Sequence, residues 1–338
     1  MSTPEEIQRL MAQADKWMGD GRFRRALAPA DEAVAGARSL GDDELLGLSL
    51  QLKGSLHLAL QEPKAAITSL EESIGPLRQA LGPSHLDVLM AQRALVDLHM
   101  AENQPEQALT HLRQMREVVE SGAPLGGWLD GTHIWTQLAE LEVSVGRPEQ
   151  AEKELEALLE WQTQKLGPDH PHIAVSLTHL ARLYRQGGNL LTAISTQRQV
   201  VAHLTRCYGE ISPDHGAALG TLATWLMEQG QEEEAELLFQ RALELATSAG
   251  REGDATGGLL LRDRGKFCLL RGQSTRAGEY LDKAAELLTR SLPADHPEVE
   301  AFFEIWAQAA DQLGQPLEGE RRRNRAQAIA NSRNRPRW

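Results

Sequence analysis

A period of about 42 residues runs through the chain and constrains its fold more than any other feature. It is marked by a small residue that returns at intervals of 40, 42, 43, 42, 42, 42 and 42 positions. The members of this series are Ala26, Ala66, Ala108, Ala151, Ala193, Ala235, Ala277 and Gly319. A repeat of this length over eight units is typical of a solenoid, in which each unit packs mainly on its neighbours.

Each unit contains two amphipathic helical patterns, and small residues are predicted where the two helices approach closely. A second small residue precedes the first by twelve positions in seven units, Val96 being the exception: Ala14, Gly54, Ala139, Ala181, Ala223, Gly265 and Ala307. A larger side chain there would force the helices apart, at about 1–3 kcal/mol. A glycine predicted to end the first helix follows in six units, at Gly21, Gly146, Gly188, Gly230, Gly272 and Gly314. Each unit is therefore predicted to be a helical hairpin.

The connectors between units also repeat. Versions of one turn occur at 40–43, 81–85, 166–171, 212–215 and 292–297, with the sequences LGDD, LGPSH, LGPDHP, SPDH and LPADHP. Glycine ends a helix, proline blocks its continuation, and Asp or Ser is predicted to cap the next helix, with Asp295 and Glu298 as a capping box. At the start of the chain, Thr3, Pro4 and Glu6 predict a capped first helix. The connector histidines lie one repeat apart and cannot converge on one ion, so we interpret them as turn structure and predict no metal site.

These residues resemble the tetratricopeptide repeat. The pattern LxxLAxLYxxxGxxxxA is formed by Leu177, Leu180, Ala181, Leu183, Tyr184, Gly188 and Ala193. The 42-residue spacing and the LGPDHP connector resemble the kinesin-light-chain-type subclass, which is common in bacterial signalling proteins. The resemblance implies an all-α, right-handed α-solenoid of about eight helix-turn-helix units. It is weakest in unit 2 (Lys53 and His57), in unit 4 (Glu142, where Tyr is usual) and in unit 8.

The predicted organisation is a single solenoid over residues 1–332 and a basic C-terminal tail at 333–338. The units are expected at 4–38, 43–81, 85–120, 132–165, 170–207, 213–249, 254–290 and 296–332. Two connectors, 121–131 with Trp128 and 251–258, are predicted to be the loosest. Trp128 would either pack against a neighbouring helix or stay exposed as a contact point.

Composition limits the compartment and the partners. No apolar run approaches the roughly 18 residues of a membrane span. The start MSTPEEIQRL is not expected to be a signal peptide. The two cysteines, 61 positions apart, are interpreted as buried thiols in a reducing cytoplasm. The net charge is −13, yet residues 321–338 hold seven arginines and no acid. The remaining chain has 28 basic and 48 acidic residues, a net charge of −20. Its body is therefore not expected to bind nucleic acid; the Arg-rich tail could be a solubilising cap, or could contact acidic lipid, nucleic acid or the protein's own acidic surface.

By the resemblance, the first helix of each unit lines a concave groove, at positions three residues before its small residue and one, four and five after it. We predict partner-binding residues at Met11, Asp15, Met18, Met90, Arg93, Asp97, Met100, Thr136, Glu140, Thr178, Arg182, Arg185, Gln186, Thr224, Met227, Arg262 and Lys266. Met90 falls at another lining position, and the stated positions also include Gln51, Ser55, Glu304, Gln308 and Asp311.

Two features of this predicted groove suggest how it would bind. Five of the six internal methionines lie on it, and methionine adapts its shape to different partners; the alternative is that they fill gaps between helices. Arg182, Arg185, Arg262 and Lys266 make units 5–7 locally basic, which suits an acidic peptide; the alternative is a solvated, neutralised face. Reversing the charges of Arg182 and Arg262 is expected to weaken binding with little effect on thermal stability.

We therefore expect a non-enzymatic adaptor that binds a peptide or helix of a partner protein. The chain has none of the motifs of nucleotide binding, nucleophilic hydrolysis or metalloprotease chemistry, and no cofactor is expected. A carboxylate clamp is disfavoured because Asn103 and Asn189 fall at turns rather than on the groove. The alternatives are a peptide-sensing regulator whose superhelix changes shape, and a scaffold that docks to membrane or nucleic acid through its Arg-rich tail.

Overall fold

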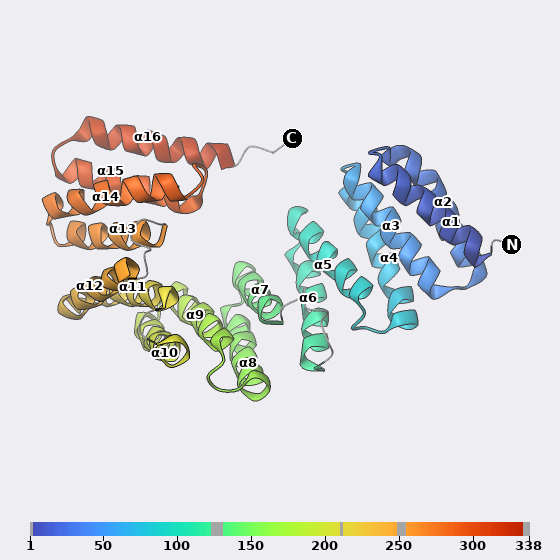
Figure 1. Cartoon of the computed structure of the whole chain (residues 1–338), viewed down its shortest axis with the longest axis horizontal. Coiled ribbons are helices and arrows are strands. Elements are labelled where there is room, and N and C mark those ends of the chain that lie inside the picture. Colours follow the sequence, from blue (N-terminus) through green and yellow to red (C-terminus); the bar gives the residue numbers. More distant parts are fainter. Residues whose placement is uncertain (1–2, 123–130, 210–211, 249–254, 334–338) are drawn as a thin grey trace. The chain divides into compact units, whose positions relative to one another are not determined.

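The computed structural model describes residues 3–122, 131–209, 212–248 and 255–333, and these residues form sixteen α-helices and no strand (Figure 1). They divide into two compact units, 1–161 and 162–338, which are called the first unit and the second unit from here on, while the individual repeats are called hairpins. The boundary falls inside one helix, and a single continuous solenoid remains a prediction. Among the described residues, no helix is long and apolar enough to cross a membrane.

The helices pair into hairpins at the predicted positions. In the first unit they are α1 Pro4–Gly19, α2 Phe23–Leu40, α3 Asp43–Ala59, α4 Pro63–Leu81, α5 Leu86–Ala101, α6 Pro105–Glu120, α7 Gly131–Ser144 and α8 Pro148–Leu166, the last crossing the boundary. The second unit continues with α9 Pro171–Gln186, α10 Leu190–Tyr208, α11 Pro213–Glu228, α12 Glu232–Ser248, α13 Ala255–Leu270, α14 Ser274–Ser291, α15 Pro297–Gln312 and α16 Pro316–Arg333. Each helix from α1 to α7 and from α9 to α16 packs on the next in its run, and Trp135 on α7 donates to Glu154 on α8. In addition, α1 contacts α3, α11 contacts α13 and α13 contacts α15. This is the stacking of an α-solenoid.

The small residues lie where the two helices of a hairpin meet. The seven alanines of the 42-residue series are fully buried, and Gly319 is buried. A Cβ atom added to Gly54 would lie 2.8 Å from Leu70 Cγ, and one added to Gly265 would lie 2.6 Å from Leu281 Cγ. The predicted close approach is confirmed, because neither position has room for a methyl group.

The turns inside the hairpins need a left-handed residue. The six predicted glycines have φ angles of 71° to 85° there. In the second and third hairpins, Gln61 with φ of 60° and Asn103 with φ of 57° take this conformation instead. The turn geometry is therefore shared, although two hairpins form it with less suitable residues.

Side chains cap the first helices of several hairpins. The Thr3 hydroxyl accepts a hydrogen bond from the Glu6 N–H at 3.3 Å, and Asp42 Oδ1 accepts one from the Leu45 N–H at 2.9 Å, as predicted. Ser212 occupies the N-cap position of α11, but its side chain makes no capping bond.

Histidine caps three other first helices, which corrects the prediction for these connectors. Nδ1 accepts the N–H of the residue two positions on, at 3.2 to 3.4 Å, for His85, His170 and His296. The expected capping box of Asp295 and Glu298 is wrong, because His296 is the N-cap residue and α15 begins at Pro297. These histidines are turn structure.

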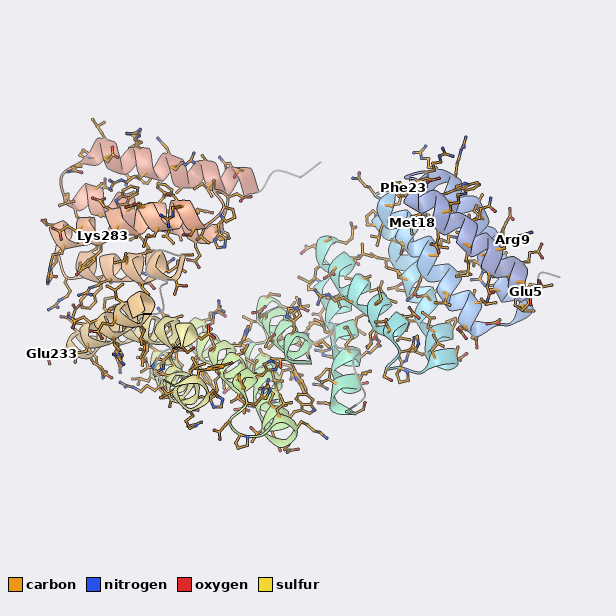
Figure 2. All side chains as sticks on the ribbon, viewed as in Figure 1. Glu5, Arg9, Met18, Phe23, Glu233 and Lys283 are labelled. Atoms are coloured by element: carbon orange, nitrogen blue, oxygen red, sulfur yellow. The ribbon has the colours of Figure 1, made fainter. Side chains whose placement is uncertain are left out.

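The interior of each unit is mainly apolar. In the second unit one cluster of buried side chains extends from Ala181 on α9 to Ala309 on α15. In the first unit, Met18 and Phe23 lie at the same end of the first hairpin and pack on a cluster shared by α1, α2 and α3 (Figure 2).

Two buried carboxylates interrupt the apolar interior of the first unit. Glu142, at the position where tyrosine is usual, is fully buried and pairs with Arg113, with Arg147 at 3.5 Å. Glu154 accepts from Arg116 at 2.6 Å and from the Trp135 indole N–H at 3.2 Å. Arginines of α6 thus supply the partners that make these acids tolerable in the core.

The two cysteines are free thiols. Cys268 is buried, as expected, whereas Cys207 is only half-buried and donates its S–H to the Asp169 carbonyl at 3.0 Å. The prediction of two buried thiols is therefore correct for one of them. Trp128, most of the 121–131 connector and residues 249–254 lie outside the described residues.

Candidate functional site

The predicted groove residues of the first unit are partly accessible. Met90 and Met100 on α5 are exposed, and Met11 and Met18 on α1 are half-buried against the core. Arg93 is held by Gln137 Oε1 at 2.7 Å and by Asp97 at 3.4 Å, and Asp15 and Glu140 are exposed. The accessible apolar surface here is thus provided by two methionines of one helix.

A cavity of about 220 Å³ lies between α5, α6 and α7. Met100 and Glu140, two predicted groove residues, line it together with Val96, Leu112, Gln137, Leu141 and Ser144. The structure therefore brings these two predictions together.

Two predicted groove residues belong to the core instead. Thr136 is buried and donates its hydroxyl to the His133 carbonyl at 3.1 Å, and Met227 is buried in the cluster of the second unit. The resemblance assigned them by position, but in this chain their side chains pack against neighbouring helices. They offer no surface to a partner.

A larger cavity of about 350 Å³ lies between α9, α10 and α11. Residues of α9, α10 and α11 line it: Pro171, His172, Ala174, Val175, Thr178, His179, Gln197, Val200, Leu204, Tyr208, Asp214, Ala217, Ala218 and Thr221. Thr178 is the one residue of the predicted set among them, and its hydroxyl donates to the Ala174 carbonyl at 2.7 Å. The cavity could not be predicted from groove positions because most of its lining lies elsewhere in the repeat.

Gln197 gives this cavity an unusual polar feature. Its side chain is buried, and Nε2 donates to the Ala218 carbonyl at 3.0 Å. Its Oε1 atom has no hydrogen-bond partner in the described part of the chain. A buried acceptor without a donor costs about 1–3 kcal/mol, so a ligand N–H that reached it would be favoured.

The predicted basic cluster of the second unit is largely neutralised. Arg185 pairs with Glu228, and Arg262 pairs with Asp263 at 2.7 Å and with Glu298. Burial raises the pKa of Asp263, although Arg262 and Lys266 oppose that shift. These arginines are thus satisfied by carboxylates of the same helix or of the first helix in the next hairpin.

The remaining predicted residues of this face differ in accessibility. Arg182 and Gln186 are exposed, and Arg182 forms no ion pair within the described ranges. Lys266 and Thr224 are half-buried, and Thr224 donates to the Gly220 carbonyl at 3.0 Å. Arg182 is therefore the cation on this face most open to a partner.

Two arginines of the C-terminal helix hold that helix to its neighbour. The Arg322 guanidinium lies 3.8 Å from the Trp306 ring centroid and donates to the Trp306 carbonyl at 3.0 Å. Arg323 pairs with Asp311 at 2.5 Å. Asp311, a predicted groove residue, is therefore already engaged in an ion pair. This supports the cap interpretation for α16; residues 334–338 lie outside the described residues.

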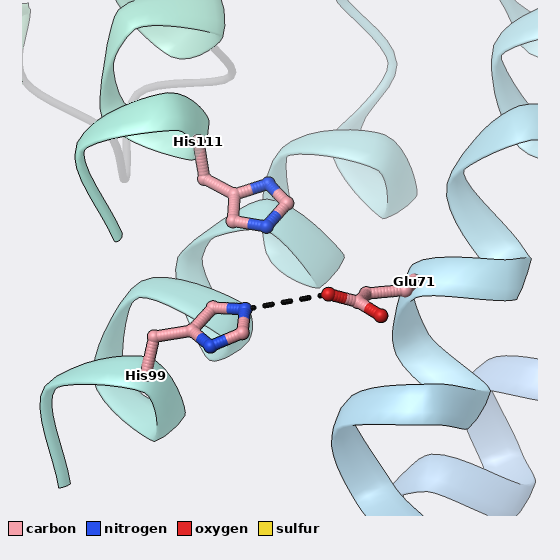
Figure 3. A group of neighbouring side chains, drawn as sticks. All are labelled: Glu71, His99 and His111. Carbon is pink, nitrogen blue, oxygen red and sulfur yellow. Dashed lines mark ion pairs between the residues drawn. The ribbon is translucent and has the colours of Figure 1, made fainter. Parts of the chain in front are cut away.

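A separate cluster of Glu71, His99 and His111 was missed at the sequence level. The three residues come from α4, α5 and α6, and their potential ligand atoms lie within 4.8 Å of one another (Figure 3). The imidazole rings stack with centroids 5.5 Å apart and an interplanar angle of 10°. Burial, and then the charge of His99, lowers the pKa of His111 to about 4. Only the connector histidines carried a repeated signal, and these two lie within helices.

Comparison with known proteins agrees with this geometry. Residues 132–206 and 180–248 match the model of the tetratricopeptide repeat family. The part of the chain from α7 to α12 therefore consists of tetratricopeptide repeats, and the chain resembles kinesin-light-chain-type proteins.

The Arabidopsis thaliana protein named Kinesin Light Chain-Related 2 is 20% identical over 290 residues, which covers 83% of this chain. The chain spans 41% of the length of that relative.

Two solved structures share the α-solenoid fold. The apo form of the quorum sensor NprR from B. thuringiensis has a TM-score of 0.57 and 15% identity, covering 96% of this chain and 87% of that chain. A Rap protein complexed with Competence and Sporulation Factor has a TM-score of 0.50 and 13% identity, covering 97% of this chain and 98% of that chain. At these identities the similarity shows the fold alone.

Proposed function

We propose that the chain is a non-enzymatic interaction scaffold that holds a peptide segment of a partner protein, with one apolar peptide side chain in the cavity between α9, α10 and α11. The observation that carries this proposal is the cavity of about 350 Å³, whose lining includes Gln197, a residue with an unpaired Oε1 atom. The free thiols of Cys207 and Cys268 suit action in a reducing cytoplasm.

The lining supports a peptide rather than a polar metabolite. Apolar atoms of Val175, Val200, Leu204 and Tyr208 dominate it, and Val175 and Tyr208 are exposed. A volume of this size accepts one large side chain. Gln197 Oε1 would then accept a peptide N–H, which adds direction to an otherwise apolar contact.

The test is a random peptide library displayed on phage and selected on the full chain. We expect enriched peptides that share one large apolar residue. Ala217→Trp fills the cavity from the exposed side of α11, so it should weaken the selected peptides at least tenfold in fluorescence anisotropy, or about 1.4 kcal/mol.

Leu237→Glu is the control, because Leu237 is exposed on α12 and does not line the cavity. It should leave the affinity unchanged. Failure to enrich any peptide, or equal binding by Ala217→Trp, would contradict the proposal.

The prediction that the basic residues bind an acidic peptide can be tested by charge reversal at Arg182 but not at Arg262. Arg262 is 15% exposed and pairs with Asp263, so reversing it would leave a buried carboxylate beside a second acid and destabilise the fold. For Arg262 we therefore expect a loss of stability in place of the small effect predicted for the double reversal. Arg182→Glu should weaken an acidic peptide while leaving the unfolding midpoint unchanged.

A peptide-sensing regulator is the second candidate. The similar folds of NprR, named a quorum sensor, and of the Rap protein solved with Competence and Sporulation Factor favour it. A selected peptide that changes the radius of gyration in solution scattering would support the regulator, and an unchanged radius would support the static scaffold.

A further inference from the structure

We propose that Glu71, His99 and His111 form a binding site for one divalent transition-metal ion of the zinc class, which would join α4 to α5 and α6. All three residues lie in the first unit. The inference is independent of the proposed peptide binding, whose cavity lies in the second unit.

The first argument is the state of His99. Its side chain is 2% exposed, and Nδ1 lies 2.9 Å from Gln104 Oε1. The Gln104 amide oxygen accepts a hydrogen bond from Nδ1, which leaves Nε2 as the ring nitrogen available to a metal ion. A hydrogen bond that orients the second nitrogen in this way is the usual companion of a metal-bound histidine.

The second argument is what His99 Nε2 faces. Among the described residues it has no hydrogen-bond partner, and it lies 3.5 Å from Glu71 Oε1. The two atoms therefore face one another without a hydrogen bond between them. A charge-assisted hydrogen bond would bring them to about 2.7–2.9 Å, whereas two ligands at zinc distances and a tetrahedral angle lie about 3.3 Å apart. The observed separation suits a shared cation.

The third argument is His111, which completes the donor set. Its ring stacks on that of His99, and Nε2 is the ring nitrogen on the side of Glu71 in Figure 3. Figure 3 shows both rings turning a nitrogen toward the Glu71 carboxylate. Because the outermost ligand atoms are 4.8 Å apart at most and the Glu71 side chain is 50% exposed, rotation of that side chain can close the set.

The ligand chemistry selects the metal. Two imidazole nitrogens and one carboxylate suit zinc, cobalt or nickel, whereas calcium and magnesium prefer oxygen ligands. Exposure of Glu71 leaves an entry path and room for water at a remaining position. A bound ion would connect three successive helices and so oppose their local opening.

The test uses the full, untagged chain stripped with a chelator and titrated with Zn²⁺ by calorimetry, and with Co²⁺ followed by its d–d absorption. We expect one ion per chain and a Co²⁺ spectrum of nitrogen and oxygen ligation. Glu71→Gln and His111→Gln should each weaken this binding at least tenfold. Zinc should also slow amide hydrogen exchange in α4, α5 and α6.

Glu72→Gln is the matched control. It makes the same change on the same helix at 51% exposure, but its carboxylate pairs with Arg38 at 3.1 Å, outside the cluster. It should bind zinc as the native chain does. Equal zinc binding by Glu71→Gln and His111→Gln, or no stoichiometric binding by the native chain, would overturn the proposal. Glu71 and His111 carry the test because neither is fully buried, so both variants should fold.

Discussion

At the scale of single residues, the turn inside the second hairpin contains a correctable strain. Gln61 has a φ angle of 60°, where a Cβ atom costs about 1–2 kcal/mol. Gln61→Gly should remove that cost from the folded chain. Glycine also increases the entropy of the unfolded chain, which offsets part of the gain, so the net stabilisation should be about 0.5–1 kcal/mol. Urea unfolding of the full chain would measure it.

Asn103 provides the comparison for this prediction. It has a φ angle of 57° at the equivalent turn of the third hairpin, and asparagine tolerates this region better than glutamine does. Asn103→Gly should therefore stabilise the chain less. A larger gain from Asn103→Gly than from Gln61→Gly would show that Cβ strain does not determine the effect.

The His111 side chain predicts a pH dependence of the metal-free chain. Its pKa is lowered from 6.5 to about 4, mainly by burial. Between these values the unfolded chain binds a proton that the folded chain does not, so this residue's contribution is complete above pH 6.5 and is lost as the pH falls toward 4. The loss is at most about 3 kcal/mol, because each pKa unit corresponds to about 1.4 kcal/mol.

His111→Gln isolates this contribution from those of the carboxylates. With chelator present, the native chain should lose more unfolding free energy between pH 6.5 and pH 4.5 than the variant does. Parallel pH profiles would contradict the lowered pKa of this histidine.

The buried polar residues show what the sequence could not predict. Glu142 departs from the usual tyrosine, and the departure is visible in the repeat alignment, but its partner Arg113 lies on another helix and outside the shared register. The cluster of Glu71, His99 and His111 likewise joins residues of different helices that are not part of the repeated pattern. Repeat spacing identifies what units have in common, whereas these contacts arise from residues that differ between units.

At the scale of helices, the sequence predicted most of the structure. The 42-residue period and the turn glycines placed all eight hairpins within a few residues of their observed ends, because glycine and proline act locally through backbone conformation. The caps were less predictable. A histidine Nδ1 can replace the Asp or Ser oxygen, as His296 does for Asp295.

The close approach of paired helices gives a prediction at this scale. A Cβ atom at Gly265 would meet Leu281 Cγ at 2.6 Å, whereas one at Gly75 on α4 would meet nothing within 4 Å. Gly265→Ala should therefore destabilise the chain by about 1–3 kcal/mol. The same change at Gly75 should stabilise it by up to about 1 kcal/mol, because alanine is the better helix former.

Urea unfolding of both variants provides the measurement, and each is the control for the other. Stabilisation by both substitutions would show that helix propensity outweighs packing at Gly265. In that case, the small residue at this position would not be needed for the hairpin to close.

At the scale of the whole molecule, the acidic character of most of the chain contrasts with a basic C-terminal helix that contacts the helix before it. The chain has a net charge of −13 despite seven arginines in its last 18 residues. Arg322 and Arg323 contact Trp306 and Asp311 on the preceding helix. These two arginines fasten the terminal repeat, so they are less available to an outside partner than the sequence suggested.

A solenoid of stacked hairpins should transmit damage only to its neighbours, and the terminal hairpin allows this to be tested. Arg322→Ala removes the guanidinium from the Trp306 ring, 3.8 Å away, and the bond to the Trp306 carbonyl. Hydrogen exchange should become faster in α15 and α16 while α1 to α6 remain unchanged, because stability in such arrays is a sum of unit and interface terms. Arg321→Ala, an exposed arginine on the same helix, should leave all rates unchanged. Faster exchange throughout the chain would instead mean that the repeats unfold as one cooperative body.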